Sequence, residues 1–130
     1  MKRTLFACFL FALSCAVSAG AQSNGNWIPE SAVVLQLDKM LHQRPVPGLG
    51  GNRAAALDDY ARYYTGLTQG GRMVIYGVFL SSDPAHYPPG LYIVDARRMP
   101  AMTGGGCTHL QLWYDVETAS VTQFRCYGLG

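Results

Sequence analysis

The chain has 130 residues and a formal net charge of +2 at pH 7, from ten Lys and Arg residues against eight Asp and Glu residues. This length predicts a single domain. Lys2 and Arg3 lie in a segment that we expect to be removed, so eight basic and eight acidic residues remain. Such a balance argues against a nucleic-acid-binding protein that relies on a basic surface.

The first 21 residues have the features of a secretory signal peptide. A short basic start, Met1–Thr4, precedes an unbroken apolar run, Leu5–Leu13, and Ala19-Gly20-Ala21 forms an A-x-A cleavage site. The apolar run has about half the length that a transmembrane helix needs. We therefore predict a periplasmic or secreted protein, cleaved after Ala21, with no transmembrane segment in the mature chain.

Lipidation at Cys15 is the alternative reading of this segment. A lipoprotein signal has an apolar residue, usually Leu, three positions before the modified cysteine and a small residue directly before it. Ala12-Leu13-Ser14-Cys15 fits that pattern only loosely. In that case the residues after Cys15 would be a tether, and the folded domain would be unchanged.

A flexible leader and a first helix are expected next. Residues 22–28 begin with a polar, glycine-containing stretch and have no regular pattern. A helix is predicted from Pro29 to His42, because Pro29 and Glu30 suit a first helical turn. The apolar residues that follow recur at spacings of three and four and form one stripe: Val33, Val34, Leu37, Met40 and Leu41.

A second helix is predicted from Arg53 to Thr65. Residues 44–51 hold two prolines and three glycines, which break helical geometry and predict a loop. Asn52 is a suitable N-cap, and Gly66 offers a stop. Four residues share one face of the expected helix: Leu57, Tyr60, Ala61 and Tyr64.

Strands are predicted after this point. Residues 72–80 are β-branched, aromatic and apolar on both sides, which is typical of a central strand with both faces covered. Residues 81–90 contain three prolines and connect to a second strand at 91–95. Residues 96–102 are compatible with a short turn of helix.

Cys107 and Cys126 are the only cysteines after the signal segment, and an even pair in an exported protein predicts a disulfide. Alternating stretches at 107–114 and 120–127 flank a turn and predict a β-hairpin with the two cysteines opposite each other.

The hairpin pattern does not decide which of its faces is buried. We favour the face that carries Leu110 and Leu112. A β-bulge would shift this register by one residue.

The predicted fold class is α+β, with two N-terminal helices packed on a four-stranded antiparallel sheet whose last hairpin is crosslinked by a disulfide. Helices that are segregated from consecutive strands indicate this class. Residues 29–130 are expected to form this single small domain.

The sequence shows no catalytic or metal-ligating pattern. His42, His86 and His109 lack the spacing of a zinc site. The acidic pair Asp58-Asp59 would diverge by about 100 degrees on a helix, so these carboxylates would not converge on one substrate atom. Asp58 and Arg62 would instead pair at a spacing of four. We predict that the protein has no cofactor and no metal. A binding protein is favoured over an enzyme.

Loops held by a rigid scaffold are the expected recognition sites. The candidates are His86 and Tyr87, which precede two prolines, the Gly104-Gly105-Gly106 run beside the disulfide, and the Arg97-Arg98 pair. Proline and a crosslink both reduce the ordering cost of binding. The sequence therefore predicts a small exported protein that binds another envelope or secreted protein, such as an enzyme inhibitor or an immunity protein.

Tyrosine supports an alternative function. All eight tyrosines lie after the signal segment, and they suit either a recognition surface or a core that borders solvent. The alternative is a small-molecule-binding domain or weak enzyme. Its pocket would lie between helix and sheet and be lined by some of Tyr60, Tyr64, Tyr76, Tyr92 and His109.

Overall fold

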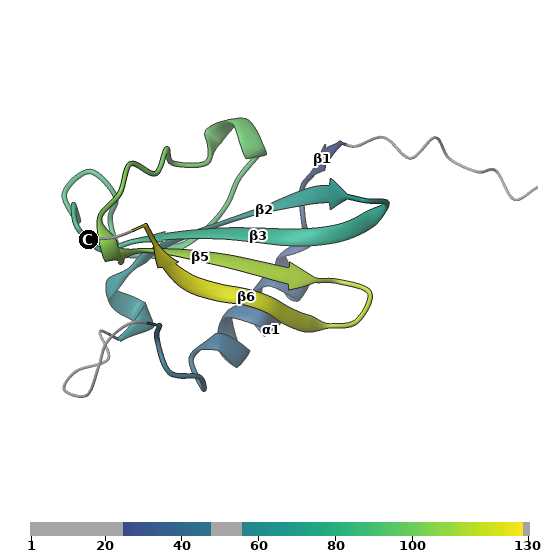
Figure 1. Cartoon of the computed structure of the whole chain (residues 1–130), viewed down its shortest axis with the longest axis horizontal. Coiled ribbons are helices and arrows are strands. Elements are labelled where there is room, and N and C mark those ends of the chain that lie inside the picture. Colours follow the sequence, from purple (N-terminus) through teal and green to yellow (C-terminus); the bar gives the residue numbers. More distant parts are fainter. Residues whose placement is uncertain (1–24, 48–55, 129–130) are drawn as a thin grey trace, which may run out of the picture.

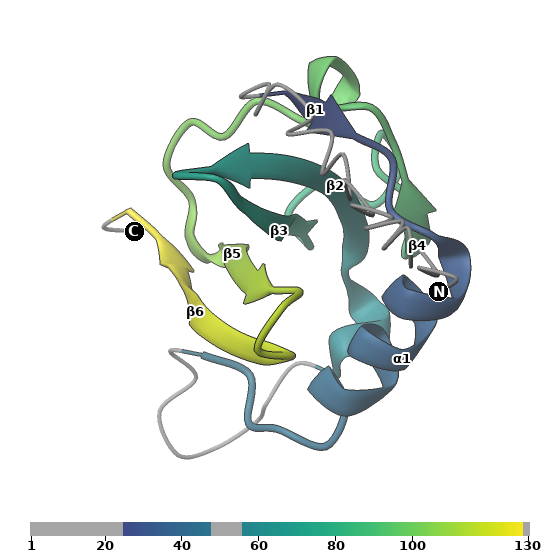
Figure 2. The same ribbon diagram turned by 90° about the vertical axis from the view of Figure 1, so that its right-hand side faces the viewer.

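A computed structural model describes residues 25–47 and 56–128 of the chain. In these ranges the elements are β1 (Asn26–Trp27), α1 (Ser31–Leu41), the 3-10 helix η1 (Leu57–Asp59), β2 (Ala61–Gln69), β3 (Arg72–Leu80), β4 (Gly90–Ile93), the 3-10 helix η2 (Ala96–Arg98), β5 (Gly106–Asp115) and β6 (Ser120–Tyr127). The strands form one curled sheet, and α1 packs on one of its faces (Figures 1 and 2). None of the helices in this part of the chain is long and apolar enough to cross a bilayer.

The strand order is β1-β2-β3-β5-β6, and neighbours along this path are antiparallel. The outer edge of β2 is covered in two pieces. β4 runs parallel to residues Ala61–Tyr64, and β1 pairs with Gly66 and Leu67. The Trp27 indole lies against Gly66, where a Cβ atom would overlap it, and its Nε1 donates to the Leu67 carbonyl at 3.0 Å.

The face that packs on α1, which we call the helix face, holds the hydrophobic core. The apolar stripe predicted for α1 supplies Val34, Leu37 and Leu41, each 2% exposed or less. The strands complete this core with Tyr64, Ile75, Phe79, Leu110 and Leu112. Their burial is the main source of favourable free energy in the fold.

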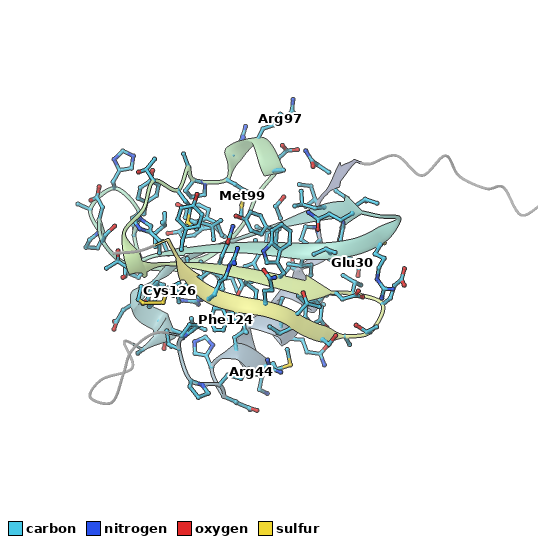
Figure 3. The ribbon with its side chains drawn as sticks, in the orientation of Figure 1. Glu30, Arg44, Arg97, Met99, Phe124 and Cys126 are labelled. Atoms are coloured by element: carbon cyan, nitrogen blue, oxygen red, sulfur yellow. A yellow bond between two sulfur atoms is a disulfide. The ribbon has the colours of Figure 1, made fainter. Side chains whose placement is uncertain are left out.

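Aromatic side chains pair between strands on the opposite face, which we call the outer face. Tyr63 of β2 stacks on Tyr92 of β4 with ring centroids 4.7 Å apart, and Tyr76 of β3 lies 4.3 Å from Trp113 of β5. The connection from β4 to β5 runs over this face, with Met99 between η2 and the strands (Figure 3). Six of the nine residues of β3 are buried, in agreement with a central strand covered on both faces.

The second predicted helix, residues 53–65, is wrong over its described part, which holds the single turn η1 and the start of β2. Tyr60 and Tyr64 share a face in either structure, because a spacing of four is about one helical turn and also two strand repeats. Pairing with β3 on one side and β4 on the other settles the choice. Gly66, expected to end a helix, lies inside β2.

The predicted leader, residues 22–28, contains β1, so its last part is not a free segment. The two-residue strand is held by the Trp27 side chain as well as by pairing with β2. Residues 22–24 lie outside the described ranges, as does the predicted signal segment 1–21 with Cys15.

The count of four strands is also wrong, because the described sheet has six. The extra strands are β1 and β2, both in segments predicted as leader or helix. The four predicted strands are present, and the shortest of them, expected at 91–95, spans Gly90–Ile93. Its pairing with β2 is parallel, whereas an antiparallel sheet was expected.

The crosslinked hairpin is confirmed, but the two cysteines are not register partners, because a shift between Gly106 and Leu110 places Cys126 opposite Leu110. Cys107 and Cys126 form a disulfide between β5 and β6, a bond typical of an oxidising compartment outside the cytoplasm. Leu110 and Leu112 are fully buried, as predicted.

The register of the hairpin is irregular rather than simple. Leu112 lies opposite Phe124, but beyond a shift between Trp113 and Tyr114 the partner of Tyr114 is Val121. The bulge in β6 therefore places Val121 and Phe124 on the helix face, although they are three positions apart and a regular strand would direct them to opposite faces. Their partly buried side chains pack against the core.

Candidate functional site

Two of the predicted recognition loops meet at one end of the sheet, next to the disulfide (Figure 1). The backbone N–H of Ser81 donates to the Thr108 carbonyl at 2.9 Å, which ties the β3–β4 connection to the start of β5. The His109 ring lies directly against Gly105, where a Cβ atom would overlap it. Gly106 belongs to β5 and is buried, so Gly104 and Gly105 are the accessible part of the glycine run.

The glycine run has a conformation that requires its sequence. Gly104, Gly105 and Gly106 have φ values of +74°, +98° and +55°. A backbone conformation with positive φ is strained for any residue that has a Cβ atom, and here it occurs at three consecutive positions. The turn that leads to the disulfide is therefore specified by its glycines.

An aromatic cluster fixes His86 and Tyr87 in the β3–β4 connection. The Tyr87 ring meets Tyr63 edge to face at 6.2 Å, and His86 lies 4.7 Å from Tyr87. Asp83 accepts hydrogen bonds from both backbones, through its side chain from His86 at 3.2 Å and through its carbonyl from Tyr87 at 2.8 Å. Tyr92 donates its hydroxyl proton to the Pro88 carbonyl at 2.7 Å.

The cluster is partly shielded from water, and this burial raises the pKa of the Tyr63 hydroxyl. His86 is exposed and Tyr87 is half-buried. The loop thus presents an ordered aromatic surface rather than a set of independent side chains.

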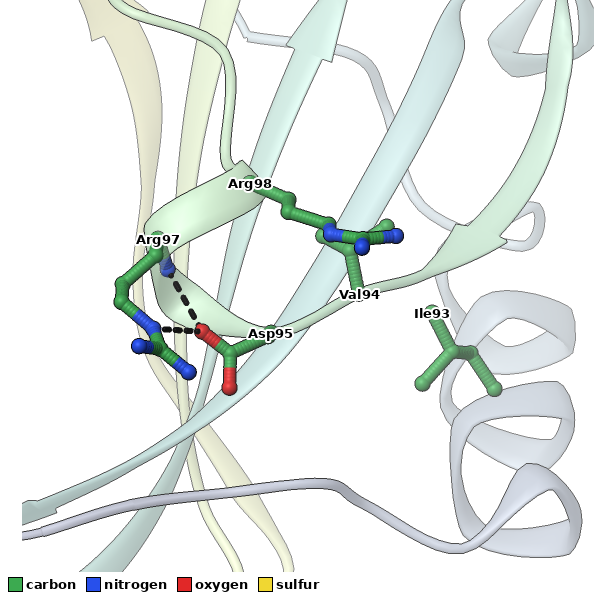
Figure 4. A pocket seen from close by; sticks show the side chains of 5 residues that line it. All are labelled: Ile93, Val94, Asp95, Arg97 and Arg98. Carbon is green, nitrogen blue, oxygen red and sulfur yellow. Dashed lines mark hydrogen bonds and ion pairs between the residues drawn. The ribbon is translucent and has the colours of Figure 1, made fainter.

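Arg97 and Arg98 lie on η2, over the outer face, rather than at the end that carries the loops (Figure 1). With Ile93, Val94 and Asp95 they line an open hollow of about 590 Å³ (Figure 4). Asp95 accepts from the Arg97 backbone at 2.9 Å and from its Nε at 3.1 Å, which holds the pKa of Asp95 below its usual value. The Arg97 side chain projects away from the molecule (Figure 3).

A buried ionic network, which was not predicted from the sequence, joins α1 to β2. Arg62 donates from Nε to Asp38 Oδ1 at 2.8 Å and from Nη2 to Oδ2 at 3.2 Å, and both residues are 7% exposed. Tyr64 donates its hydroxyl proton to Asp38 Oδ1 at 2.6 Å. Burial also raises the pKa of the Tyr64 hydroxyl, which keeps that group protonated as a donor.

His42 extends this network to the surface. Its Nδ1 donates to the Asp38 carbonyl at 2.7 Å, and its Nε2 lies 2.7 Å from Asp58 Oδ1. The predicted Asp58–Arg62 pair is present only at 4.0 Å, because Arg62 is directed into the domain toward Asp38. The network therefore joins the end of α1 to η1 and β2.

One signal in the sequence indicated this network. Asp38 is four residues after Val34 and directly follows Leu37, so it falls within the apolar stripe of the helix. A carboxylate at such a position needs a buried partner. Arg62 was not recognised as that partner because it was assigned to a solvated helix face.

We expect the contribution of His42 to stability to depend on pH. The hydrogen bonds to the Asp38 carbonyl and to the Asp58 carboxylate raise the pKa of His42 above its ordinary 6.5, against a smaller opposing effect of burial. A group whose pKa is higher in the folded protein than in the unfolded chain stabilises the fold. This stabilisation is fully present when the pH is below the pKa of the unfolded chain, and it is lost as the pH rises through the pKa of the folded protein. The neighbouring charges are Asp38, Asp58 and Arg62.

The measurement is the free energy of unfolding of the wild type and of His42→Gln across the range from about pH 5 to about pH 8. The difference between the two proteins should be larger at the acidic end. An NMR titration of His42 should give a pKa above 6.5. A difference that does not change with pH would contradict the proposed charge pairing.

The tyrosines expected to line one pocket lie on two faces of the sheet. Tyr60 and Tyr64 are buried, 1% and 0% exposed, at the helix side. Tyr76 and Tyr92 are half-buried on the outer face. The hydroxyl of Tyr60 donates to the Cys107 carbonyl at 2.8 Å, so this polar group is already satisfied. These four side chains therefore do not line a common cavity between helix and sheet.

Within residues 25–47 and 56–128, no group of three His, Cys, Asp or Glu side chains is arranged to hold a metal ion. Comparison of the chain with family models, with curated proteins and with solved structures finds no match.

Proposed function

We propose that this chain is a small exported periplasmic protein, cleaved after Ala21, that acts by binding another envelope or secreted protein, as an enzyme inhibitor or immunity protein does. The contact is assigned to the surface formed by His86, Tyr87, Gly104 and Gly105, which we call the loop surface. The disulfide supports a location outside the cytoplasm.

The observation that carries the proposal is the ordered state of Tyr87 in an otherwise exposed loop. Tyr63 and His86 hold its ring, and Asp83 holds its backbone. A preformed aromatic anchor loses little conformational entropy when it enters a partner's pocket. Tyrosine is also among the residues that dominate the binding energy of protein interfaces.

The Gly104–Gly105 turn supports the same surface. Its accessible backbone lies beside a disulfide and allows a partner to approach closely. Arg97 and Arg98 form a separate candidate contact on η2, and guanidinium groups there would pair with carboxylates of a partner.

The test is site-specific photocrosslinking in the periplasm, with the crosslinking residue at position 87 and, as a control, at Gln69, an exposed residue beside the β2–β3 turn at the opposite end of the sheet. We expect one stoichiometric partner from position 87 and none from Gln69. With the purified pair, Tyr87→Ala should weaken binding by roughly 30-fold, which corresponds to about 2 kcal/mol for an interface anchor.

Gly105→Arg tests the second half of the loop surface, and the pair Arg97→Ala and Arg98→Ala tests η2. Circular dichroism must show that each variant is folded. Unchanged affinity for both Tyr87→Ala and Gly105→Arg would make the assignment of the loop surface wrong.

A further inference from the structure

β6 is the last strand of the sheet path, and among the described residues it pairs only with β5. It has eight residues, Ser120–Tyr127, with no proline and with Arg125 as its one charged side chain. An edge strand of this length offers backbone donors and acceptors to another chain unless it carries proline or several charges.

Hydrogen bonds on β5 identify the backbone groups that are directed outward. Val116 N–H donates to the Met73 carbonyl of β3, whereas the Trp113 carbonyl accepts from the Thr122 hydroxyl of β6. Backbone groups of successive residues are directed alternately to the two neighbouring strands, so the N–H and C=O of Leu112 are directed to β3. The pair that Leu112 forms with Phe124 of β6 is therefore a non-hydrogen-bonded pair. The N–H and C=O of Phe124 are therefore directed away from β5, toward the edge along which no described strand pairs.

The helix side of this edge is apolar, and the segment after α1 lies beside its Cys126 end, with the Pro47 carbonyl 3.4 Å from Cys126 Sγ. The partly buried side chains of Val121 and Phe124 pack at the margin of the core, and Phe124 lies on the α1 side of the ribbon (Figure 3). Beside them α1 and the β5–β6 turn enclose an open hollow of about 370 Å³, lined by Gln36, Leu37, Met40, Tyr114 and Ala119. Alternate side chains of an added strand would lie over this margin.

The outer side of the same edge is cationic. Arg125 is exposed, and its Nη2 donates to Gln111 Oε1 at 3.3 Å. Gln111 in turn donates from Nε2 to the Tyr76 hydroxyl at 2.8 Å. This chain of hydrogen bonds positions the guanidinium on the outer face next to the edge, where it can pair with a carboxylate of a neighbouring strand.

We propose that the β6 edge binds an extended segment of another protein, in which apolar side chains directed toward α1 alternate with acidic side chains directed toward Arg125. The added strand would use the outward N–H and C=O of Phe124 for pairing. A second copy of β6 is the poorer occupant, since it would bring Arg125 and no carboxylate. This surface is distinct from the loop surface, so either assignment can fail alone.

The probe is a capped eight-residue peptide of alternating Val and Glu, titrated into the purified exported protein by fluorescence anisotropy. Two control peptides separate the contributions. In one, Lys replaces Glu, and in the other, every backbone amide of the Val-Glu peptide is N-methylated, so that neither edge of the peptide can donate a backbone hydrogen bond. We expect saturable binding of the Val-Glu peptide below about 1 mM and roughly tenfold weaker binding of both controls.

Arg125→Glu should reverse the preference in favour of the Val-Lys peptide. The matched control, Arg98→Glu, makes the same charge change at an exposed position on η2 and should leave the preference as it is. Tyr87→Ala should not affect the peptide, which separates this result from the test of the loop surface.

Three outcomes of the peptide titrations would overturn the proposal. They are no binding of the Val-Glu peptide at about 1 mM, equal binding of the N-methylated peptide, and an unchanged preference in Arg125→Glu. A dimer of the protein that the Val-Glu peptide does not dissociate would assign the edge to a second copy and would also overturn it.

Discussion

Replacing Arg62 with Leu is expected to lower the free energy of unfolding by about 3 to 5 kcal/mol. The guanidinium satisfies both carboxylate oxygens of Asp38, and both side chains are nearly inaccessible. Removing it leaves a buried carboxylate with Tyr64 as its remaining side-chain donor. The measurement is urea unfolding of the purified protein followed by circular dichroism.

A double variant distinguishes a lost ion pair from lost packing. Arg62→Leu combined with Asp38→Leu removes both charges and should recover part of the loss, because apolar replacement of a buried pair is often close to neutral. Recovery is incomplete because the buried Tyr64 hydroxyl loses its acceptor. Arg97→Leu is the matched control, since its side chain is 87% exposed and pairs only with Asp95 among the described residues. Equal losses in the single and double variants would contradict an electrostatic cause.

Removal of the disulfide has the second large expected effect. Cys107 and Cys126 are 19 residues apart in the sequence. A crosslink that closes this loop reduces the number of conformations available to the unfolded chain. The chain-entropy model gives about 3 kcal/mol for a crosslink of this span. Cys107→Ser combined with Cys126→Ser should therefore unfold at a markedly lower urea concentration than the oxidised wild type.

Reduction of the wild type should reproduce this loss, whereas a reducing agent should not affect the double variant. Mass spectrometry of the exported protein should show a mass two hydrogens below that of the reduced chain. A reduced protein with the same urea midpoint as the oxidised one would mean that the crosslink contributes little to stability.

Elements with a single consistent pattern could be predicted from the sequence. The strand at 72–80 was predicted with its observed bounds, because β-branched and apolar residues run without a break between two turn signals. The apolar stripe of α1 followed from periodicity, whereas the hairpin pattern left its buried face undecided and the face with Leu110 and Leu112 was only favoured. The disulfide followed from cysteine count and export.

The parts that failed depend on contacts between distant residues. Tyr60 and Tyr64 fit a helix as well as a strand, and only pairing with β3 and β4 distinguishes the two. β1 has only two residues, which is too few for a periodic pattern. Its Trp27 packs against Gly66, which is distant in the sequence.

The same limit applies to the candidate site. The β3–β4 loop and the glycine run were predicted as separate candidates, and the sequence indicated neither their shared end of the sheet nor the aromatic contact that orders Tyr87. Its partner Tyr63 had been assigned to a helix. The partner of Asp38 was missed for the same reason, since Arg62 lies in the same misassigned segment.

The divided outer edge of β2 implies an order of assembly. β2–β3 and β5–β6 are hairpins whose contacts are local in sequence, whereas β1 and β4 reach β2 only after longer loops close. Loop-closure entropy favours the local pairs early in folding. In the native protein the amides of β1 and β4 should then exchange with deuterium through local opening, while β3 and β5 exchange only when the whole domain unfolds.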